Sequence, residues 1–306
     1  MADTALQTTG LWFRYQEDSP VLRGIDLQVP RGQFLALVGA NGSGKTTLVK
    51  HFNGLLRPWQ GQVFVYGQET AGRSVGELAR QVGFLFQHPE QQIFSASVRQ
   101  EVAFGPHNLG VVPAEVDRRV EAALARFDLS AIANRPPAIL SYGVRRQVTL
   151  ASLAAMDPPI LVLDEPTVGL DARGVGETVA WLQELHAAGR TILLVTHDMG
   201  LVVEHAERAI VLSEGGIVAD GTPADLFGQP ELLARASLGQ PPVMALAQAL
   251  SPWGLAGDAL TVETFCRAYE ALYQARSLAS TPPPAQEGRS TTGGDDRASQ
   301  RGEGQP

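Results

Sequence analysis

Short apolar runs bounded by turn residues occur along the first third of the chain and predict buried strands. These strands are expected at residues 11–15, 24–29, 34–38, 62–66 and 82–86. After residue 157, strands at 160–163, 191–196, 209–212 and 216–219 are expected, together with helices at 175–186 and 201–205. Strands that alternate with helices are typical of an α/β fold with a mostly parallel sheet, in which ligands bind at the carboxyl ends of strands.

The middle and the end of the chain have helical patterns instead. Helices are expected at 97–104, 113–127 and 144–156, and shorter ones at 224–227, 230–236, 243–250 and 261–275. From residue 280 onward, Pro, Gly, Ser, Thr and charged residues leave too little apolar surface to offset the entropy of ordering. We therefore predict a main domain (1–222) with a helical subdomain at about 88–157, a small C-terminal helical domain (223–279) and a disordered tail (280–306).

Composition narrows the classes of protein to consider. The chain has 306 residues, of which 44% are hydrophobic and 18% charged, which is typical of a globular protein. Its net charge of −8 argues against a nucleic-acid-binding surface. The single cysteine, Cys266, excludes an internal disulfide framework and suits a reducing compartment. No apolar run is long enough to span a bilayer, so we expect any membrane role to come through a partner.

The most informative stretch follows the strand at 34–38 and precedes a helical segment: Gly39-Ala40-Asn41-Gly42-Ser43-Gly44-Lys45-Thr46-Thr47. Glycines let backbone N–H groups close around phosphate oxygens, and the helix N-terminus adds its positive dipole end. In such a loop the lysine reaches the β- and γ-phosphates and the first threonine binds Mg²⁺. An ordinary glycine-rich turn is the alternative, but it does not require strand, loop and helix in this order. The sequence therefore predicts a nucleoside triphosphate site.

A second buried strand, at 160–163, delivers two carboxylates, Asp164 and Glu165. Asp164 is placed to hold Mg²⁺, directly or through water, and Glu165 is the natural general base for a water that attacks the γ-phosphate. An acidic pair after an apolar strand is often only a helix-capping turn. The phosphate loop elsewhere in the chain favours the catalytic interpretation.

Ser141 and Gly143 stand at the start of the helix expected at 144–156. Ser141 is either a simple N-cap or, with the glycine N–H and the helix dipole, part of an anion site. With the loop and the acidic pair, this helix start resembles an ATP-binding cassette (ABC) ATPase. The resemblance implies a P-loop NTPase core with a mostly parallel sheet, an antiparallel β edge, a helical subdomain and a small C-terminal helical extension. It also implies that Ser141 and Gly143 contact the γ-phosphate held by an opposite subunit.

Other positions match the family's motifs in order, and the resemblance covers residues from about 11 to 221. Tyr15 matches the aromatic that stacks on adenine, with a plain core aromatic as the alternative. Gln87 matches the loop glutamine that senses Mg²⁺ and links the core to the helical subdomain. Asp171 resembles the aspartate of the loop across the dimer interface. His197 matches the switch histidine at the γ-phosphate, although a lone histidine is more often structural.

The segment Phe86-Gln87-His88-Pro89-Glu90-Gln91-Gln92-Ile93-Phe94 and residues 98–106 are similar to the ATPase subunits of energy-coupling factor transporters. These importers of bacteria and archaea take up vitamins or transition-metal ions. The resemblance implies an ATP- and Mg²⁺-dependent ATPase at the cytoplasmic face of the cell membrane. Its implied partners are a second cassette, an integral membrane coupling subunit gripped by a groove near residues 87–106, and a membrane subunit that binds the substrate.

One motif departs from the family, whose signature is usually Leu-Ser-Gly-Gly-Gln. Here Tyr142 replaces the first glycine and Val144 replaces the glutamine. We therefore favour a heterodimer with a distinct cassette over a homodimer. Two alternative functions stay open: the ATPase of another ABC transporter type, and a soluble, non-transport ABC ATPase acting on DNA or ribosomes. The acidic net charge and the single cassette in the sequence weigh against the second.

Overall fold

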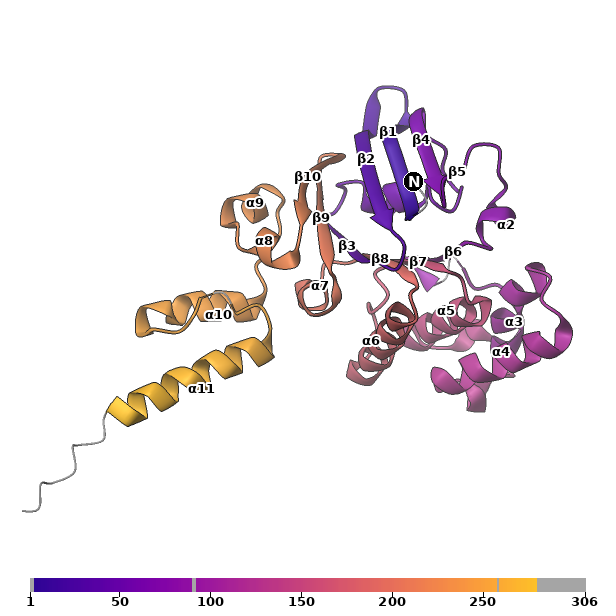
Figure 1. Cartoon of the computed structure of the whole chain (residues 1–306). Helices are drawn as coiled ribbons and strands as arrows, with labels where there is room; N and C mark the ends of the chain where they lie inside the picture. The colour runs from indigo at the N-terminus through magenta and orange to yellow at the C-terminus, as the bar shows by residue number, and fades with distance from the viewer. Residues whose placement is uncertain (1–2, 90–91, 258, 280–306) are drawn as a thin grey trace, which may run out of the picture.

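The computed structural model describes residues 3–89, 92–257 and 259–279. Two sheets lie one above the other in Figure 1, with a group of helices below the larger sheet and a further group to one side. The predicted disordered tail, residues 280–306, lies outside the described residues.

The larger sheet has six strands in the order β10-β9-β3-β8-β7-β6. Its strands are β3 (Phe34–Val38), β6 (Val82–Leu85), β7 (Ile160–Asp164), β8 (Thr191–Val195), β9 (Arg208–Ser213) and β10 (Gly216–Gly221). All neighbours pair in parallel except β9 and β10, which form an antiparallel edge. β3, β6, β7 and β8 are buried along their whole length, as expected for a parallel sheet covered on both faces. The predicted α/β fold is confirmed.

The second sheet is wholly antiparallel, with the order β2-β1-β4-β5. It comprises β1 (Thr4–Gln16), β2 (Ser19–Pro30), β4 (Gln60–Val65) and the short β5 (Gln68–Glu69). β1 and β2 are much longer than predicted because their outer parts alternate buried and exposed residues, and the polar positions interrupt the apolar runs. Antiparallel structure therefore forms a separate layer as well as the β10 edge.

The helical subdomain is built from three longer helices, α3 (Val98–Asn108), α4 (Pro113–Arg126) and α5 (Tyr142–Met156). Two short 3₁₀ turns, η2 (Ser130–Ile132) and η3 (Pro137–Ile139), connect α4 to α5. Ser97 and Ser141 cap α3 and α5 by accepting hydrogen bonds from backbone N–H groups. α5 begins two residues earlier than predicted, directly after its cap. The capped helix α2 (Val75–Leu78) was not predicted, because four residues show no periodicity.

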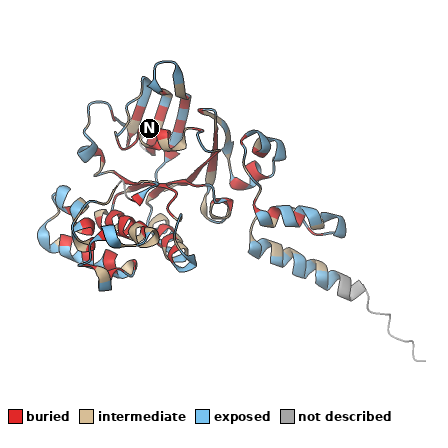
Figure 2. Cartoon of the chain, turned by 180° about the vertical axis from the view of Figure 1, so that it is seen from behind, coloured by how far each residue is buried: buried red, intermediate tan, exposed pale blue. Residues whose placement is uncertain are grey.

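The strands β3, β7 and β8 are each followed by a helix: α1 (Lys45–Val49), α6 (Ala172–Ala187) and α7 (Met199–His205), respectively. One apolar cluster fills the space between the two sheets, and a second joins the larger sheet to α3, α4, α5 and α6. Figure 2 shows these buried residues as a continuous band through the strands and the inner faces of the helices. The site described below lies at the carboxyl ends of β3 and β7 in the larger sheet.

The C-terminal helices are α8 (Pro223–Phe227), α9 (Pro230–Arg235), α10 (Pro242–Leu250) and α11 (Val262–Ala279), with the 3₁₀ turn η4 (Ser251–Trp253) after α10. Residues of α8 and α9 share an apolar cluster with β9. α10 and α11 share only a small one, and Figure 1 shows them projecting away from the sheets. The domain boundaries at 222 and 279 stay a prediction. Across the described residues, no helix has both the length and the apolar character that crossing a membrane requires.

His51 is buried directly behind α1. Its Nδ1 lies 2.8 Å from the Thr47 carbonyl oxygen, and its ring meets that of Phe13 edge to face with centroids 4.9 Å apart. Burial lowers the pKa of His51, and hydrogen bonds to the Thr47 and Leu48 backbone oppose this shift more weakly. The folded protein therefore holds this imidazole neutral at a pH where an exposed histidine takes up a proton.

This burial predicts a contribution to the pH dependence of stability. Below about pH 6.5 the unfolded chain protonates His51 while the folded chain does not, so its contribution to stability falls as the pH falls. His51→Gln keeps a donor but removes the titration. Between about pH 7.5 and 5.5, wild type should lose more melting temperature than His51→Gln. Equal losses in the two proteins would show that His51 titrates alike in the folded and unfolded states.

Candidate functional site

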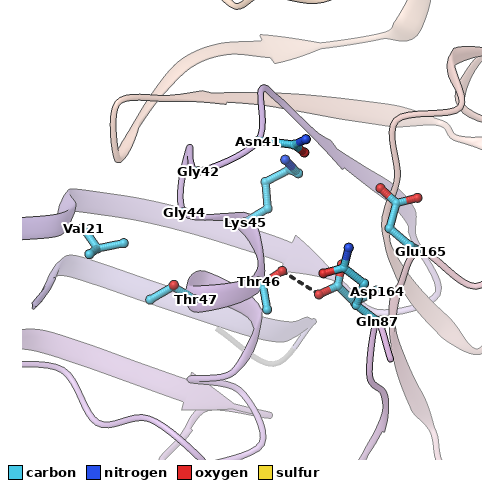
Figure 3. Close-up of a pocket in the computed structure, with 10 residues that line it drawn as sticks. All are labelled: Val21, Asn41, Gly42, Gly44, Lys45, Thr46, Thr47, Gln87, Asp164 and Glu165. Atoms are coloured by element: carbon cyan, nitrogen blue, oxygen red, sulfur yellow. Dashed lines mark hydrogen bonds between the residues drawn. The ribbon is translucent and has the colours of Figure 1, made fainter. Parts of the chain in front are cut away.

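A pocket of about 380 Å³ opens beside the carboxyl ends of β3 and β7. Figure 3 shows the residues that line it, which come from the loop after β3, from α1 and from the ends of neighbouring strands. They are Val21, Asn41, Gly42, Gly44, Lys45, Thr46, Thr47, Gln87, Asp164 and Glu165. The structure thus brings together most of the predicted phosphate loop, both predicted carboxylates and the predicted glutamine. Val21, near the start of β2, was not predicted, because a single valine gives no signal of a binding site in the sequence.

The loop between β3 and α1 has a backbone conformation that leaves no room for a Cβ at some of its glycines. Gly39 has φ +151°, and a Cβ built on it would lie 2.2 Å from the Leu212 carbonyl oxygen of β9. Gly44, with φ +106°, stands directly before the first turn of α1. Ser43 is held at its carbonyl by the Gly215 N–H, at 3.2 Å. The loop is therefore fixed against the turn between β9 and β10, and its glycines are required by close contact.

Lys45 turns its ammonium back toward the loop. Its Nζ donates hydrogen bonds to the carbonyl oxygens of Gly39, at 2.8 Å, and Ala40, at 2.9 Å. Burial lowers the pKa of Lys45, and the negative charges of Glu165 and Asp164 act in the opposite direction. The positive charge is thus already held over the loop, where phosphate oxygens would lie.

Thr46 and Asp164 are joined by a hydrogen bond, in which the threonine Oγ1 donates to the aspartate Oδ2 at 2.6 Å (Figure 3). Burial raises the pKa of Asp164, and the hydrogen bond from Thr46 opposes that shift. Gln87 lines the same pocket. A hydroxyl, a carboxylate and an amide oxygen are hard donors of the kind that Mg²⁺ prefers, so these residues fit that ion. Within the described ranges, no group of three or more His, Cys, Asp or Glu side chains is arranged to hold a metal ion.

Glu165 is held by three contacts at the end of β7. Its backbone, with φ +53°, donates from N–H to the Val195 carbonyl oxygen at 2.9 Å. Its side chain accepts a hydrogen bond from the Thr196 hydroxyl at 3.2 Å and lies 2.7 Å from His197 Nδ1. The Glu165 side chain is only 10% exposed, whereas that of His197 is 72% exposed. The buried carboxylate is therefore held in place by the Thr196 hydroxyl and by His197, and the His197 ring is exposed to solvent.

Tyr15 lies beside the loop rather than in the core. It is 61% exposed, its hydroxyl is 3.2 Å from Thr47 Oγ1, and its ring meets that of Phe13 edge to face. The alternative of a buried core aromatic is therefore wrong. An exposed aromatic ring beside a residue that lines the pocket offers a flat surface on which a base could stack.

Ser141, Gly143 and Asp171 do not line this pocket. Ser141 caps α5 and Asp171 caps α6, each accepting a hydrogen bond from the backbone N–H three residues later. Gly143 packs so closely on the next loop that a Cβ would lie 2.6 Å from the Gly169 carbonyl oxygen. These local roles do not test the prediction that the three residues act on the nucleotide of an opposite subunit.

Two further residues near the site were missed by sequence analysis. Thr196 positions Glu165, as described above, and Arg146 is a buried arginine that contacts the backbone of Gln87. An arginine in the middle of a helix normally suggests an exposed surface, so the sequence gives no sign of this burial.

Comparison with known proteins gives consistent matches. The profile of the family described as "ABC transporter" matches residues 22–168. The chain is 40% identical over 248 residues to the "Energy-coupling factor transporter ATP-binding protein EcfA" of Methanocaldococcus jannaschii, covering 80% of this chain and 89% of that protein.

Solved structures show the same similarity. The structure of cbiO1 from Clostridium perfringens, described as part of the ABC transporter complex cbiONQ, superposes with a TM-score of 0.67 at 33% identity, over 82% of this chain and 97% of that one. A dimeric ATP-binding cassette in a post-hydrolysis state, bound to ADP and Pi, superposes with a TM-score of 0.65 at 25% identity, over 71% of this chain and 98% of that one.

The glycine contacts predict unequal effects of two substitutions in the loop. Gly39→Ala places a methyl group against Leu212, whereas Gly42→Ala, at φ +81°, meets nothing within 4 Å. Both variants carry backbone strain of about 1–2 kcal/mol, but only Gly39→Ala must also displace the loop. We expect it to bind ATP at least about tenfold more weakly than Gly42→Ala. Isothermal titration of the two purified variants measures this, and equal affinities would contradict the close contact.

Proposed function

Because this chain belongs to the ATP-binding subunits of ABC transporters, we propose that it drives an importer of the energy-coupling factor type. It is an ABC ATPase, and its substrate in this role is ATP. The importer would take up a vitamin or a transition-metal ion, chosen by a separate membrane subunit. The observation that carries the proposal is a pocket that brings Lys45, Asp164 and Glu165 together, in a chain that is 40% identical to an energy-coupling factor ATPase over most of both proteins.

The residues of the pocket have separable roles in this proposal. Residues of the loop at 39–47 bind the phosphates through backbone N–H groups, and Lys45 neutralises their charge. Mg²⁺ bound with the nucleotide supplies further positive charge, and Thr46, Asp164 and Gln87 are the residues that would hold it. The ring of Tyr15 receives the adenine.

Hydrolysis needs a base at the attacking water. Glu165 is the carboxylate that accepts the water's proton, because Thr196 and His197 fix its two oxygens and leave it facing the pocket. His197 is largely exposed beside that carboxylate, and in this proposal it contacts the γ-phosphate. Catalysis then consists of positioning and charge neutralisation around the transferred phosphoryl group.

A dimer supplies the remaining groups. Ser141, Gly143 and Asp171 lie outside the chain's own pocket, and in this proposal they complete the site of a second cassette. The exposed N-terminus of α5 presents the Ser141 hydroxyl and helix dipole to that nucleotide. Val144, in place of the usual glutamine, weakens this contribution, so we favour a distinct cassette as partner.

The helical subdomain carries the surface proposed to meet the membrane subunit. Phe94 and Phe104 are 64% and 45% exposed, and their rings meet edge to face with centroids 4.5 Å apart. The buried Glu101 holds this surface by accepting hydrogen bonds from the N–H groups of Phe94, at 3.1 Å, and Ser95, at 2.8 Å. Exposed aromatic pairs of this kind suit a partner's apolar side chains. The chain would thus lie at the cytoplasmic face of the membrane, attached through its partners.

The proposed base predicts a specific loss of turnover. Glu165→Gln keeps the shape of the side chain and one of its two acceptor oxygens, but the amide cannot accept the proton. Hydrolysis should therefore slow by about a hundredfold or more while MgATP still binds. Glu204→Gln, an exposed change on α7, serves as the control. Steady-state turnover and ATP affinity are measured on the complex purified with its membrane subunits. Wild-type turnover in Glu165→Gln would remove the residue from this role, and failure to co-purify any membrane subunit would contradict the importer.

The heterodimer predicts a difference between two assemblies. With this chain as its only cassette, the complex should turn over several-fold more slowly than the complex that also contains a distinct cassette. Val144→Gln should recover part of that difference. Turnover per nucleotide site, measured on both complexes, checks this. Equal turnover, unchanged by Val144→Gln, would favour a homodimer.

A further inference from the structure

We propose that Tyr142 and Arg146 are positioning residues that hold Gln87 in the nucleotide pocket and tie it to the N-terminus of α5. Gln87 belongs to the chain's own pocket, whereas the start of α5 is assigned above to the site of the partner cassette. The two side chains would therefore link the two sites. The inference rests on the proposed function only for the second of these sites.

The contacts converge on one short stretch of backbone. Arg146 donates from Nη1 to the Phe86 carbonyl oxygen at 2.6 Å and from Nη2 to the Gln87 carbonyl oxygen. The Tyr142 hydroxyl donates to the same Gln87 oxygen at 3.3 Å and lies 3.3 Å from Arg146 Nη2. Three donors thus fix the backbone just beyond the carboxyl end of β6, where Gln87 enters the pocket.

Burial makes this arrangement unusual. Arg146 is fully buried, and its guanidinium also lies over the ring of Tyr142, 5.9 Å from the centroid. A buried cation is unfavourable unless its hydrogen bonds are well formed, so the side chain is constrained to the positions of its acceptors. Displacement of the Gln87 backbone would break the hydrogen bonds that the buried guanidinium donates to this stretch of backbone. The link between α5 and Gln87 is therefore rigid rather than a loose surface contact.

Tyr142 extends the link to a third segment. It is the first residue of α5 and stands one turn before Arg146, so both side chains lie on the same face of the helix. A Cβ on Gly169 would lie 2.4 Å from the Tyr142 ring, so this tyrosine packs directly on the loop that leads to Asp171. The tyrosine at a position where the family usually has glycine thus has a role: it joins Gln87 and the loop at 169–171 to the same helix start.

A purely structural role for Arg146 is the competing explanation. It predicts that Arg146 variants lose stability, and that their losses of ATP affinity and turnover add to those caused by a substitution of Gln87. A positioning role predicts instead that Arg146 matters only while the Gln87 side chain is present. A double-mutant cycle separates these cases, because residues that act through one another give non-additive effects.

The experiment measures two quantities for each variant: the ATP affinity of the purified chain with and without Mg²⁺, and turnover of the purified complex. Arg146→Met should leave the Mg²⁺-free affinity unchanged, weaken the Mg²⁺-dependent gain several-fold, and lower turnover by about tenfold. Arg146→Lys, which keeps a donor for one carbonyl, should restore part of both. In the Gln87→Ala background, Arg146→Met should cause no further loss in either quantity.

Arg119→Met is the matched control, since Arg119 also donates to a backbone carbonyl of this subdomain, that of Met156, but does so at the far end of α5. It should change neither quantity. If Arg146→Met does not fold, Tyr142→Phe enters the same cycle, because it removes only the hydroxyl that contacts Gln87. Additive losses, or wild-type behaviour of the Arg146 and Tyr142 variants, would overturn the proposal. The affinity measurement uses the chain alone, so it stands whether or not the importer is confirmed.

Discussion

The close packing of backbone on backbone around the loop at 39–47 is the constraint on which the nucleotide pocket depends. Gly39 lies against the Leu212 carbonyl, and the Gly215 N–H bonds to Ser43, so the loop is supported by the turn between β9 and β10. That turn joins β9 and β10, which pair antiparallel at the edge of the larger sheet. The antiparallel edge is thus part of the site, because it fixes where the phosphate-binding N–H groups point.

Much of the fold could be predicted because its strands are buried on both faces. β3, β7 and β8 are uninterrupted apolar runs, so their ends, and with them Asp164 and Glu165, were placed within a residue. The predicted ranges of β1 and β2 are too short, because one face of each strand is exposed to solvent and its polar residues interrupt the apolar pattern. The predicted starts of α5 and α6 are too late. The first turn of each helix carries little apolar periodicity, so its assignment depends on identifying the capping residue, Ser141 or Asp171.

The residues of the candidate site also differ in how far the sequence predicts them. Residues whose chemistry depends on local spacing, such as Lys45 and Thr46, could be assigned from sequence, and they line the pocket. Residues whose role depends on tertiary contact could not. Arg146 reaches Gln87 across 59 positions of sequence. Tyr142 departs from the family's motif, and its contact with the same carbonyl oxygen depends on the tertiary structure. No pattern along one chain carries that information.

The two hydrogen bonds that Lys45 donates to its own loop have a consequence for nucleotide binding. A phosphate that binds the Lys45 ammonium must displace the two hydrogen bonds that it donates within the loop. The net free energy of this contact is therefore the difference between two similar interactions. Affinity is thereby moderated, while the loop stays in its binding shape between turnovers and needs no reorganisation. A preformed loop of moderate affinity favours release of ADP after each cycle of hydrolysis.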